Sequence, residues 1–249
     1  MTNQSILEKL RDMKLTGMYN SFHAALETRE HQALTADELV AMLVEGEYNH
    51  RRNLRVRATI KRAKFRYNAM VEHVDFSAQR GLERNSYTRL VDCSFIERHE
   101  NVIFTGPTGA GKSYLASALG HQACMMGFKV RYFNMSKLFT SLKMSKADAS
   151  YLKELNRLER QDLLILDDFG LYPVETALRL ALLDIIEDRH GKRSTVFVSQ
   201  IPVSKWHELL GEQTVADAIL DRVVHSSHRI ELKGESMRKK NGLDGNKKP

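Results

Sequence analysis

The segment LLILDDFG, residues 163–170, runs from four apolar residues directly into two consecutive aspartates. The apolar run predicts a buried strand, which places Asp167 and Asp168 at its carboxyl end. Two adjacent carboxylates repel each other and resist burial unless a cation or a proton-transfer role awaits them. The pair therefore predicts a cation site or an acid–base centre at the tip of this strand.

A second segment predicts a ligand that would bring such a cation. GPTGAGKS matches G-x-x-x-x-G-K-[ST], follows the apolar run NVIFT and precedes a helical pattern. Its glycines allow backbone N–H groups to wrap a triphosphate, which a chance lysine in a glycine-rich turn would not explain. The predicted ATP-binding residues here are Gly106, Pro107, Thr108, Gly109, Ala110, Gly111, Lys112 and Ser113.

Separate roles can then be predicted for the two aspartates. Asp167 and the hydroxyl of Ser113 are the expected Mg²⁺ ligands, and Lys112 is the expected charge at the β- and γ-phosphates. Asp168 is expected to orient or deprotonate the attacking water, although capping a following helix is an alternative use. ATP and Mg²⁺ are the predicted cofactors.

The elements that must position these residues alternate along the chain. The strand candidates NVIFTG, KVRYFN, LLILDD, STVFVS and HRIEL are separated by helical patterns. Such alternation predicts an α/β fold with a mainly parallel sheet flanked by helices.

A small all-helical domain is expected to precede the sheet, over residues 1–75. The segment TADE predicts a capping box at Thr35 and Glu38, followed by a long helix. Residues 51–66, RRNLRVRATIKRAKFR, contain eight basic residues and no acidic one. On a helical period Arg51, Arg55, Arg62 and Arg66 share one side, which predicts a nucleic-acid contact or a solvated face paired with acidic groups. The ATPase domain is expected over 76–238, with a basic tail over 239–249.

Composition favours an anionic partner and argues against a membrane protein. The 249 residues are 42% hydrophobic and carry a formal net charge of +7. The polar–apolar start resembles neither a signal peptide nor a membrane anchor, so a cytoplasmic protein with no membrane partner is expected. Cys93 and Cys124 are expected to be buried small hydrophobes, and His225 and His228 are not expected to bind zinc.

Three segments together resemble a known family: GPTGAGKSYLASALG, DLLILDDFG and ILDRVVHSSHRIELKGESMR. They are similar to IstB-like ATP-binding proteins, helper ATPases of insertion-sequence transposition that are related to the DnaC-type helicase loaders within the AAA+ superfamily. The likeness covers essentially the whole chain. It implies an AAA+ P-loop NTPase domain whose active site is completed by a neighbouring subunit.

The resemblance also implies roles for three further residues. Arg222 falls at the arginine-finger position, which acts on the γ-phosphate of an adjacent protomer, with Arg193 and Arg229 as alternatives. Arg238 matches the sensor-2 position, and Gln200 matches sensor 1, where relatives often carry asparagine. Catalysis is thus expected from Asp168, Lys112, Arg222 and Gln200.

As a function, the resemblance implies an ATP-dependent homo-oligomer that binds duplex DNA non-specifically, remodels it as a target and stimulates a cognate transposase. The expected DNA-contacting residues are Arg51, Arg52, Arg55, Arg62, Arg66, Lys137, Lys143 and Lys146. A helicase-loader adaptor is the alternative function. A small-molecule P-loop kinase is a third, and neither a lid nor an acceptor pocket for it is evident in the sequence.

Overall fold

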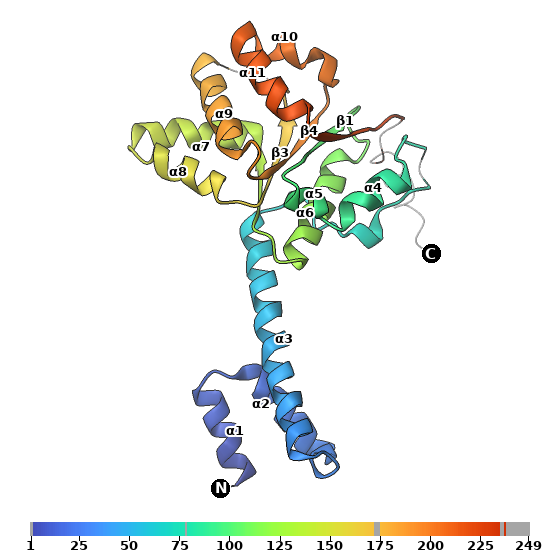
Figure 1. Cartoon of the computed structure of the whole chain (residues 1–249), viewed down its shortest axis with the longest axis vertical. Coiled ribbons are helices and arrows are strands. Elements are labelled where there is room, and N and C mark those ends of the chain that lie inside the picture. The colour runs from blue at the N-terminus through green and yellow to red at the C-terminus, as the bar shows by residue number, and fades with distance from the viewer. Residues whose placement is uncertain (1, 78, 172–174, 235–236, 238–249) are drawn as a thin grey trace, which may run out of the picture. The chain divides into compact units, whose positions relative to one another are not determined.

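The computed structural model describes residues 2–77, 79–171, 175–234 and 237 (Figure 1). The chain divides into two compact units, Met1–Ala58 and Thr59–Pro249. In the part of the chain that is described, no helix is both long enough and apolar enough to span a bilayer.

The first unit is helical, as predicted. It contains α1 (Asn3–Asp12), α2 (Thr16–Glu27), the 3₁₀ turn η1 (Glu30–Gln32) and most of α3 (Ala36–Ala63). Leu7, Leu10 and Phe22 form its buried cluster. The predicted capping box forms at the start of α3, where Glu38 Oε2 accepts from Thr35 N at 2.8 Å and Thr35 Oγ1 accepts from Glu38 N at 3.3 Å.

Two glycines allow α2 and α3 to approach closely within this unit. A Cβ on Gly17 would lie 2.3 Å from the carbonyl oxygen of Gly46, so a larger residue would force the helices apart. The buried Glu47 carboxylate accepts from Gly17 N at 2.7 Å and from Met18 N at 3.2 Å, which satisfies orphan donors of the first turn of α2. Burial alone would raise the pKa of Glu47, but Arg51 and these N–H groups lower it.

The boundary between the units lies earlier than the expected position near residue 75. Residues 59–75 belong to the second unit because their apolar side chains are buried there: Ala63, Ala69 and Val74 are members of its core cluster. The basic segment 51–66 is therefore divided between the two units. Charge pattern did not predict this division, because the division depends on which core the apolar residues enter.

The second unit is an α/β domain, as predicted. Its strands are β1 (Asn101–Thr105), β2 (Val130–Asn134), β3 (Leu163–Phe169), β4 (Ser194–Ser199) and β5 (Ser227–Glu231). Its helices are α4 (Arg84–Val91), α5 (Ser94–Glu97), α6 (Lys112–Met125), α7 (Met135–Ala147), α8 (Tyr151–Glu159), α9 (Thr176–Arg189), α10 (Trp206–Leu210) and α11 (Gln213–Val224), with 3₁₀ turns η2 (Val71–His73) and η3 (Val203–Lys205). All five strands coincide with the predicted segments.

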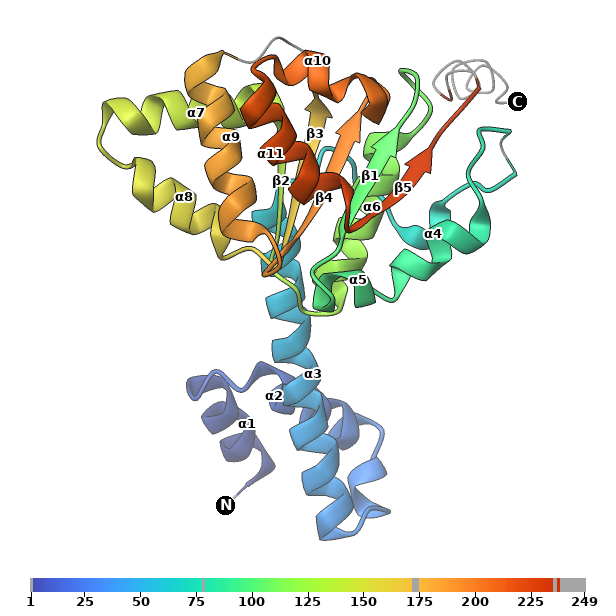
Figure 2. The ribbon, with the colours of Figure 1, turned by 45° about the horizontal axis from the view of Figure 1, so that its top comes forward.

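The five strands form one parallel sheet in the order β2-β3-β4-β1-β5, with helices on both faces (Figure 2). Alternate residues of each strand enter opposite cores. Ile165 joins the cluster beneath α4 and α6, whereas Leu164 and Leu166 join the cluster formed with α7, α9 and α11. Because the strands are all parallel, the carboxyl ends of β1, β3 and β4 meet at one edge of the sheet. Parallel α/β folds place their ligands at this edge.

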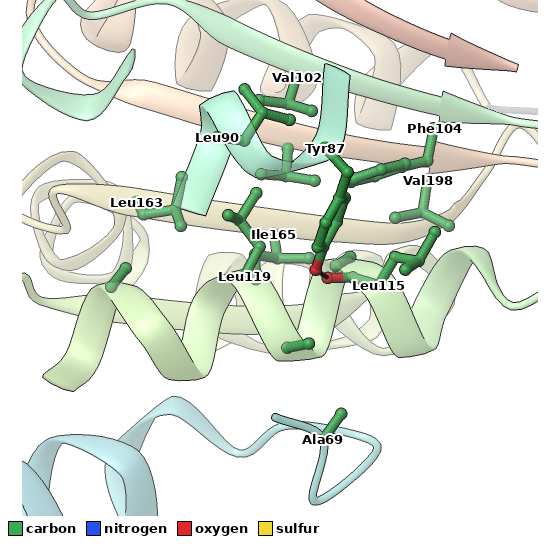
Figure 3. Close-up of a cluster of buried hydrophobic side chains, with 14 of the residues drawn as sticks. Ala69, Tyr87, Leu90, Val102, Phe104, Leu115, Leu119, Leu163, Ile165 and Val198 are labelled. Atoms are coloured by element: carbon green, nitrogen blue, oxygen red, sulfur yellow. Dashed lines mark hydrogen bonds between the residues drawn. The ribbon is translucent and has the colours of Figure 1, made fainter. Parts of the chain in front are cut away.

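The hydrophobic core between the sheet and α6 holds in place this helix, which follows β1 (Figure 3). Tyr87 of α4 is buried between Phe104 and α6, and its hydroxyl donates to the carbonyl of Leu115 at 3.0 Å. Cys93 and Cys124 are buried in the same cluster as unpaired thiols, as expected. Burial raises the pKa of each thiol to about 12, which makes them unreactive.

Candidate active site

The loop between β1 and α6 is held open by glycine. Gly111 precedes α6 with φ +94°, a left-handed conformation that a side chain would strain, and a Cβ there would lie 2.4 Å from Nη1 of Arg80. Arg80 is only 4% exposed and donates through Nη1 to the carbonyl of Ala110 at 3.2 Å. This buried arginine therefore holds the backbone of the loop in place through its hydrogen bond to Ala110. Sequence reasoning missed it, because a lone arginine in a connector carries no recognisable pattern.

Lys112 lies at the first position of α6 with its side chain folded over the loop. It is 6% exposed, and its Nζ donates to the carbonyls of Gly106 at 2.7 Å and Pro107 at 2.8 Å. The ammonium group is thus held within a ring of backbone groups at the amino end of a helix. That position suits a charge that neutralises phosphate oxygens.

Asp167 is fully buried and surrounded by donors. Its Oδ1 accepts from Ser113 Oγ at 3.0 Å and from the backbone N–H of Asp168 at 2.9 Å. Its Oδ2 accepts from the hydroxyl of Tyr132 and from Nη1 of Arg66 at 3.2 Å. Serine and aspartate from two separate motifs are therefore in direct contact.

A β-bulge brings the second aspartate to the same side. Leu166 pairs with Phe197 and Phe169 with Ser199, so Asp167 and Asp168 together oppose one residue of β4. Asp168 takes a left-handed conformation, φ +59°, which aspartate tolerates better than most residues. In a regular strand consecutive side chains would point to opposite faces, but here one guanidinium contacts both carboxylates.

The residues around Asp168 also come from distant segments. Asp168 Oδ2 accepts from Nδ2 of Asn134, at the end of β2, at 2.6 Å and from Nη1 of Arg66 at 3.3 Å. Sequence reasoning did not select Asn134 or Tyr132, which β2 brings beside β3. Burial and the Asp167 carboxylate raise the pKa of Tyr132, so its hydroxyl remains a donor.

Arg66 occupies a different place from the one the helical pattern predicted. Helix α3 ends at Ala63, so Arg66 is not part of a helical stripe with Arg51, Arg55 and Arg62. Its Nη1 forms ion pairs with both Asp167 and Asp168. Burial opposes its charge, but Tyr67, Asp167 and Tyr132 outweigh that effect and raise its pKa. The guanidinium thus remains charged in contact with the two aspartates.

Arg66, Lys112, Ser113 and Asp168 line a cavity of about 530 Å³, which we call the P-loop cavity. Gln200, just after β4, faces it, and its Oε1 accepts from Thr108 Oγ1 at 2.5 Å. The lining residues from outside the loop are Arg66, Tyr67, His73, Asp75, Tyr114, Asp168, Leu171, Val198, Ser199, Gln200 and Met237. The loop, Gln200 and Asp168 therefore line one cavity.

Arg222 lies elsewhere in the second unit. It is on α11, where its guanidinium pairs with Glu187 at 2.9 Å and donates to the carbonyl of Ala218 at 2.9 Å. Arg222 does not belong to the described residues that line the P-loop cavity. Arg238, the predicted sensor 2, lies outside the described residues.

The predicted DNA-contacting residues fall into different environments. Arg51 pairs with Glu47 at 2.7 Å, Lys143 pairs with Glu175 at 2.7 Å, and Lys146 Nζ lies 4.7 Å from the ring centroid of Tyr151. Lys137 lines a separate cavity beside β2. The remaining candidates, Arg52, Arg55 and Arg62, are exposed along α3.

The donor set around Asp167 suits Mg²⁺. A hydroxyl oxygen and a buried carboxylate oxygen lie 3.0 Å apart, and hard oxygen ligands are those that Mg²⁺ prefers. Such a cation would be held by Ser113 and Asp167 and would leave room for phosphate oxygens and water.

A parallel sheet with a phosphate-binding loop after its β1 strand and paired acids at the end of β3 defines a P-loop nucleotide-binding domain with the AAA+ fold. The fold is similar to that in the crystal structure of DnaI, with a TM-score of 0.57 and 21% identity over 71% of this chain and 93% of that one. It is also similar to replication initiator DnaA bound to AMPPCP and single-stranded DNA, with a TM-score of 0.56 and 15% identity over 74% of this chain and 57% of that one.

The chain belongs to the family of IstB-like ATP binding proteins, whose family model matches residues 8–245. It is 43% identical to "Putative insertion sequence ATP-binding protein y4pL" of Sinorhizobium fredii, over 94% of this chain and 95% of that protein. It is 31% identical to the IS21 ATP-binding protein of Pseudomonas aeruginosa, over 93% of this chain and 87% of that protein. The predicted family is thereby confirmed.

Proposed function

We propose that this ATP-binding protein is a Mg²⁺-dependent ATPase that assembles on duplex DNA and acts with a transposase in insertion-sequence transposition. The observation that supports ATP hydrolysis most strongly is the position of Asp167 and Asp168. Both carboxylates lie on one side of β3, beside Ser113 and Lys112. Family membership and the names of the relatives support the insertion-sequence context. The net charge of +7 supports a polyanionic partner.

The chain's own groups would divide the work of hydrolysis. Lys112 would exchange its bonds to the Gly106 and Pro107 carbonyls for phosphate oxygens. When bound at Ser113 and Asp167, Mg²⁺ would neutralise charge on the phosphates. Asp168 would accept the proton of the attacking water or orient that water, and Asn134 would hold its carboxylate in place.

The decisive experiment for hydrolysis compares Asp168→Asn with the unaltered protein. Removing the base should lower ATP turnover by roughly 10²–10⁴-fold while leaving ATP affinity within a few-fold. Phosphate release and binding of a fluorescent ATP analogue measure the two quantities. Turnover that survives Asp168→Asn would assign the water to another group and contradict the proposed role.

Assembly is supported by the position of Arg222, which does not line the P-loop cavity of its own chain and pairs with Glu187 instead. In an oligomer it would supply positive charge to a neighbour's γ-phosphate. Arg222→Ala should bind ATP normally but hydrolyse it at least about 10³-fold more slowly. Mixing this variant with Asp168→Asn subunits should restore turnover, because the two kinds of subunit would complement each other. If the mixtures stay inactive, Arg222 does not act between subunits.

DNA and helicase functions can be separated directly. In the presence of ATP, the protein should remain bound to immobilised long duplex DNA. The protein should also stimulate the activity of its purified cognate transposase. Retention that requires a replicative helicase and single strands, with no duplex binding, would favour the helicase-loader function instead.

A further inference from the structure

A second cavity, of about 770 Å³, lies beside the edge strand β2. Its walls come from residues 64–66, β2, α7 and α8. Glu154 is its only acidic residue within the described part of the chain. We call it the basic cavity, and its cations are Lys64, Arg66, Arg131, Lys137 and Arg157.

These cations are incompletely neutralised by the protein itself. Glu154 pairs with Arg157 at 2.9 Å, and Arg66 pairs with the aspartates of the P-loop cavity. The ion pairs found among described residues include none to Lys64, Arg131 or Lys137. A group of like charges with so few counter-charges gains from binding an anion.

Arg131 is the least satisfied of them. It projects from β2 with its guanidinium 5.4 Å from the ring centroid of Phe133. Its Nη1 donates to the carbonyl of Arg62, while its Nε is buried and has no hydrogen-bond partner among the described residues. Burial, and next the charge of Arg157, lower the pKa of Arg131. An anion beside this guanidinium would relieve both costs.

The chemistry of the cavity suits a phosphodiester backbone. Arginine and lysine together are the usual protein partners of phosphate oxygens, and arginine binds them with a planar fork. Lys64, Lys137 and Arg157 are exposed, so a long polyanion outside the cavity could reach them. A polymer with regularly spaced charges would contact several of these cations at once.

The wall shared by the two cavities contains the groups that hold the aspartates. Arg66 lines both cavities. Tyr132, whose hydroxyl donates to Asp167, lines the basic cavity. Arg66 places positive charge 3.2 Å from Asp167 and 3.3 Å from Asp168, where it opposes the binding of a cation such as Mg²⁺ and occupies both carboxylates.

We propose that the basic cavity binds a backbone phosphate of duplex DNA, and that this phosphate draws Arg66 away from Asp167 and Asp168. DNA in the cavity then frees both carboxylates for hydrolysis. The inference rests on the proposed function, an ATPase that assembles on duplex DNA, and adds to it a DNA site and a means by which DNA would stimulate hydrolysis.

The binding site is tested with matched pairs of charge removals. Lys137→Gln combined with Arg157→Gln should weaken binding of labelled duplex DNA about tenfold or more and reduce the slope of log affinity against log salt by about 1 to 2. Lys153→Gln combined with Arg160→Gln removes the same charge from exposed residues in or directly after α8, which also carries Arg157, but outside the cavity, and should change both little. Fluorescence anisotropy at several salt concentrations, with a non-hydrolysable ATP analogue present, measures both.

The outcomes separate the inference from the function on which it rests. Equal losses in the two pairs would mean that total charge, and not the cavity, binds DNA, which would overturn the inference alone. Undiminished binding in the first pair would do the same. If the unaltered protein binds no duplex DNA, the proposed function fails together with the inference.

The coupling is tested with Arg66→Gln and its conservative partner Arg66→Lys. Arg66→Gln should raise ATP turnover without DNA several-fold, abolish further stimulation by DNA, and lower the Mg²⁺ concentration needed for half-maximal binding of an ATP analogue. Arg66→Lys keeps the charge and should restore the low turnover and the DNA response. Intact stimulation in Arg66→Gln, or turnover that falls with and without DNA, would overturn the release of the aspartates by Arg66.

Discussion

The P-loop cavity and the basic cavity both present positive charge to an anion, yet the chain builds them differently. In the P-loop cavity, the groups predicted to bind phosphate belong to one continuous loop, with backbone groups and Lys112 at a helix amino end. The basic cavity is formed by side chains from four separated segments. A site built from one loop depends on a few residues that cannot be replaced. A site built from separate side chains divides its binding free energy among them.

The largest effect is expected in the P-loop cavity. Lys112→Ala removes the one charge buried within the loop and should weaken ATP binding at least about 100-fold, or about 3 kcal/mol. Titration with a fluorescent ATP analogue measures this loss, and circular dichroism checks that the variant is folded. Binding within a few-fold of the unaltered protein would show that the loop does not depend on this residue.

A smaller effect is expected from the backbone of the same loop. Gly111→Ala should lower the free energy of unfolding by about 2.5 kcal/mol, because it adds a clash with Arg80 to the strain of a positive φ. Urea unfolding measures the change. Gly127→Ala is the matched control, since its φ is +97° but nothing lies within 4 Å, and it should cost only about 1 kcal/mol. Equal costs would exclude the contact with Arg80 as the cause.

The shared wall should show an intermediate dependence. Tyr132→Phe removes a donor to the buried Asp167 carboxylate and should destabilise the second unit by about 1.5–3 kcal/mol. Tyr151→Phe removes an exposed hydroxyl 3.4 Å from Asp184 and should change unfolding by less than about 0.5 kcal/mol. A Tyr132→Phe cost as small as the control's would mean that Arg66 and Ser113 suffice to stabilise Asp167.

The smallest effect is expected for a single cation of the basic cavity. Lys64→Gln should weaken duplex DNA binding by no more than about 1 kcal/mol and reduce the salt slope by about 1, since other cations remain. Anisotropy titrations at several salt concentrations measure it. A loss comparable to that of Lys112→Ala for ATP would break the comparison, because the basic cavity would then depend on one residue as well.

The family, the phosphate-binding loop and the five strands could be predicted because each depends on patterns within short contiguous segments of the sequence. Apolar runs specify strands locally, and glycine, lysine and serine at fixed spacing specify a loop whatever surrounds it. The contact between Ser113 and Asp167 also follows from such patterns, since parallel strands end at one edge of a sheet. These features depend on the backbone and its immediate neighbours.

Only the tertiary structure decided where Arg66 and Arg131 lie. The helical period placed Arg66 on a stripe with Arg51, but α3 ends at Ala63 and the chain turns Arg66 toward Asp167. The bulge that aligns the two aspartates and the pairing of β2 with β3 that adds Asn134 depend on neighbouring strands. The sequence alone determined a nucleotide-binding AAA+ domain. Which cations face its carboxylates was decided by long-range packing, because charged side chains take partners that folding brings near, whatever their separation along the chain.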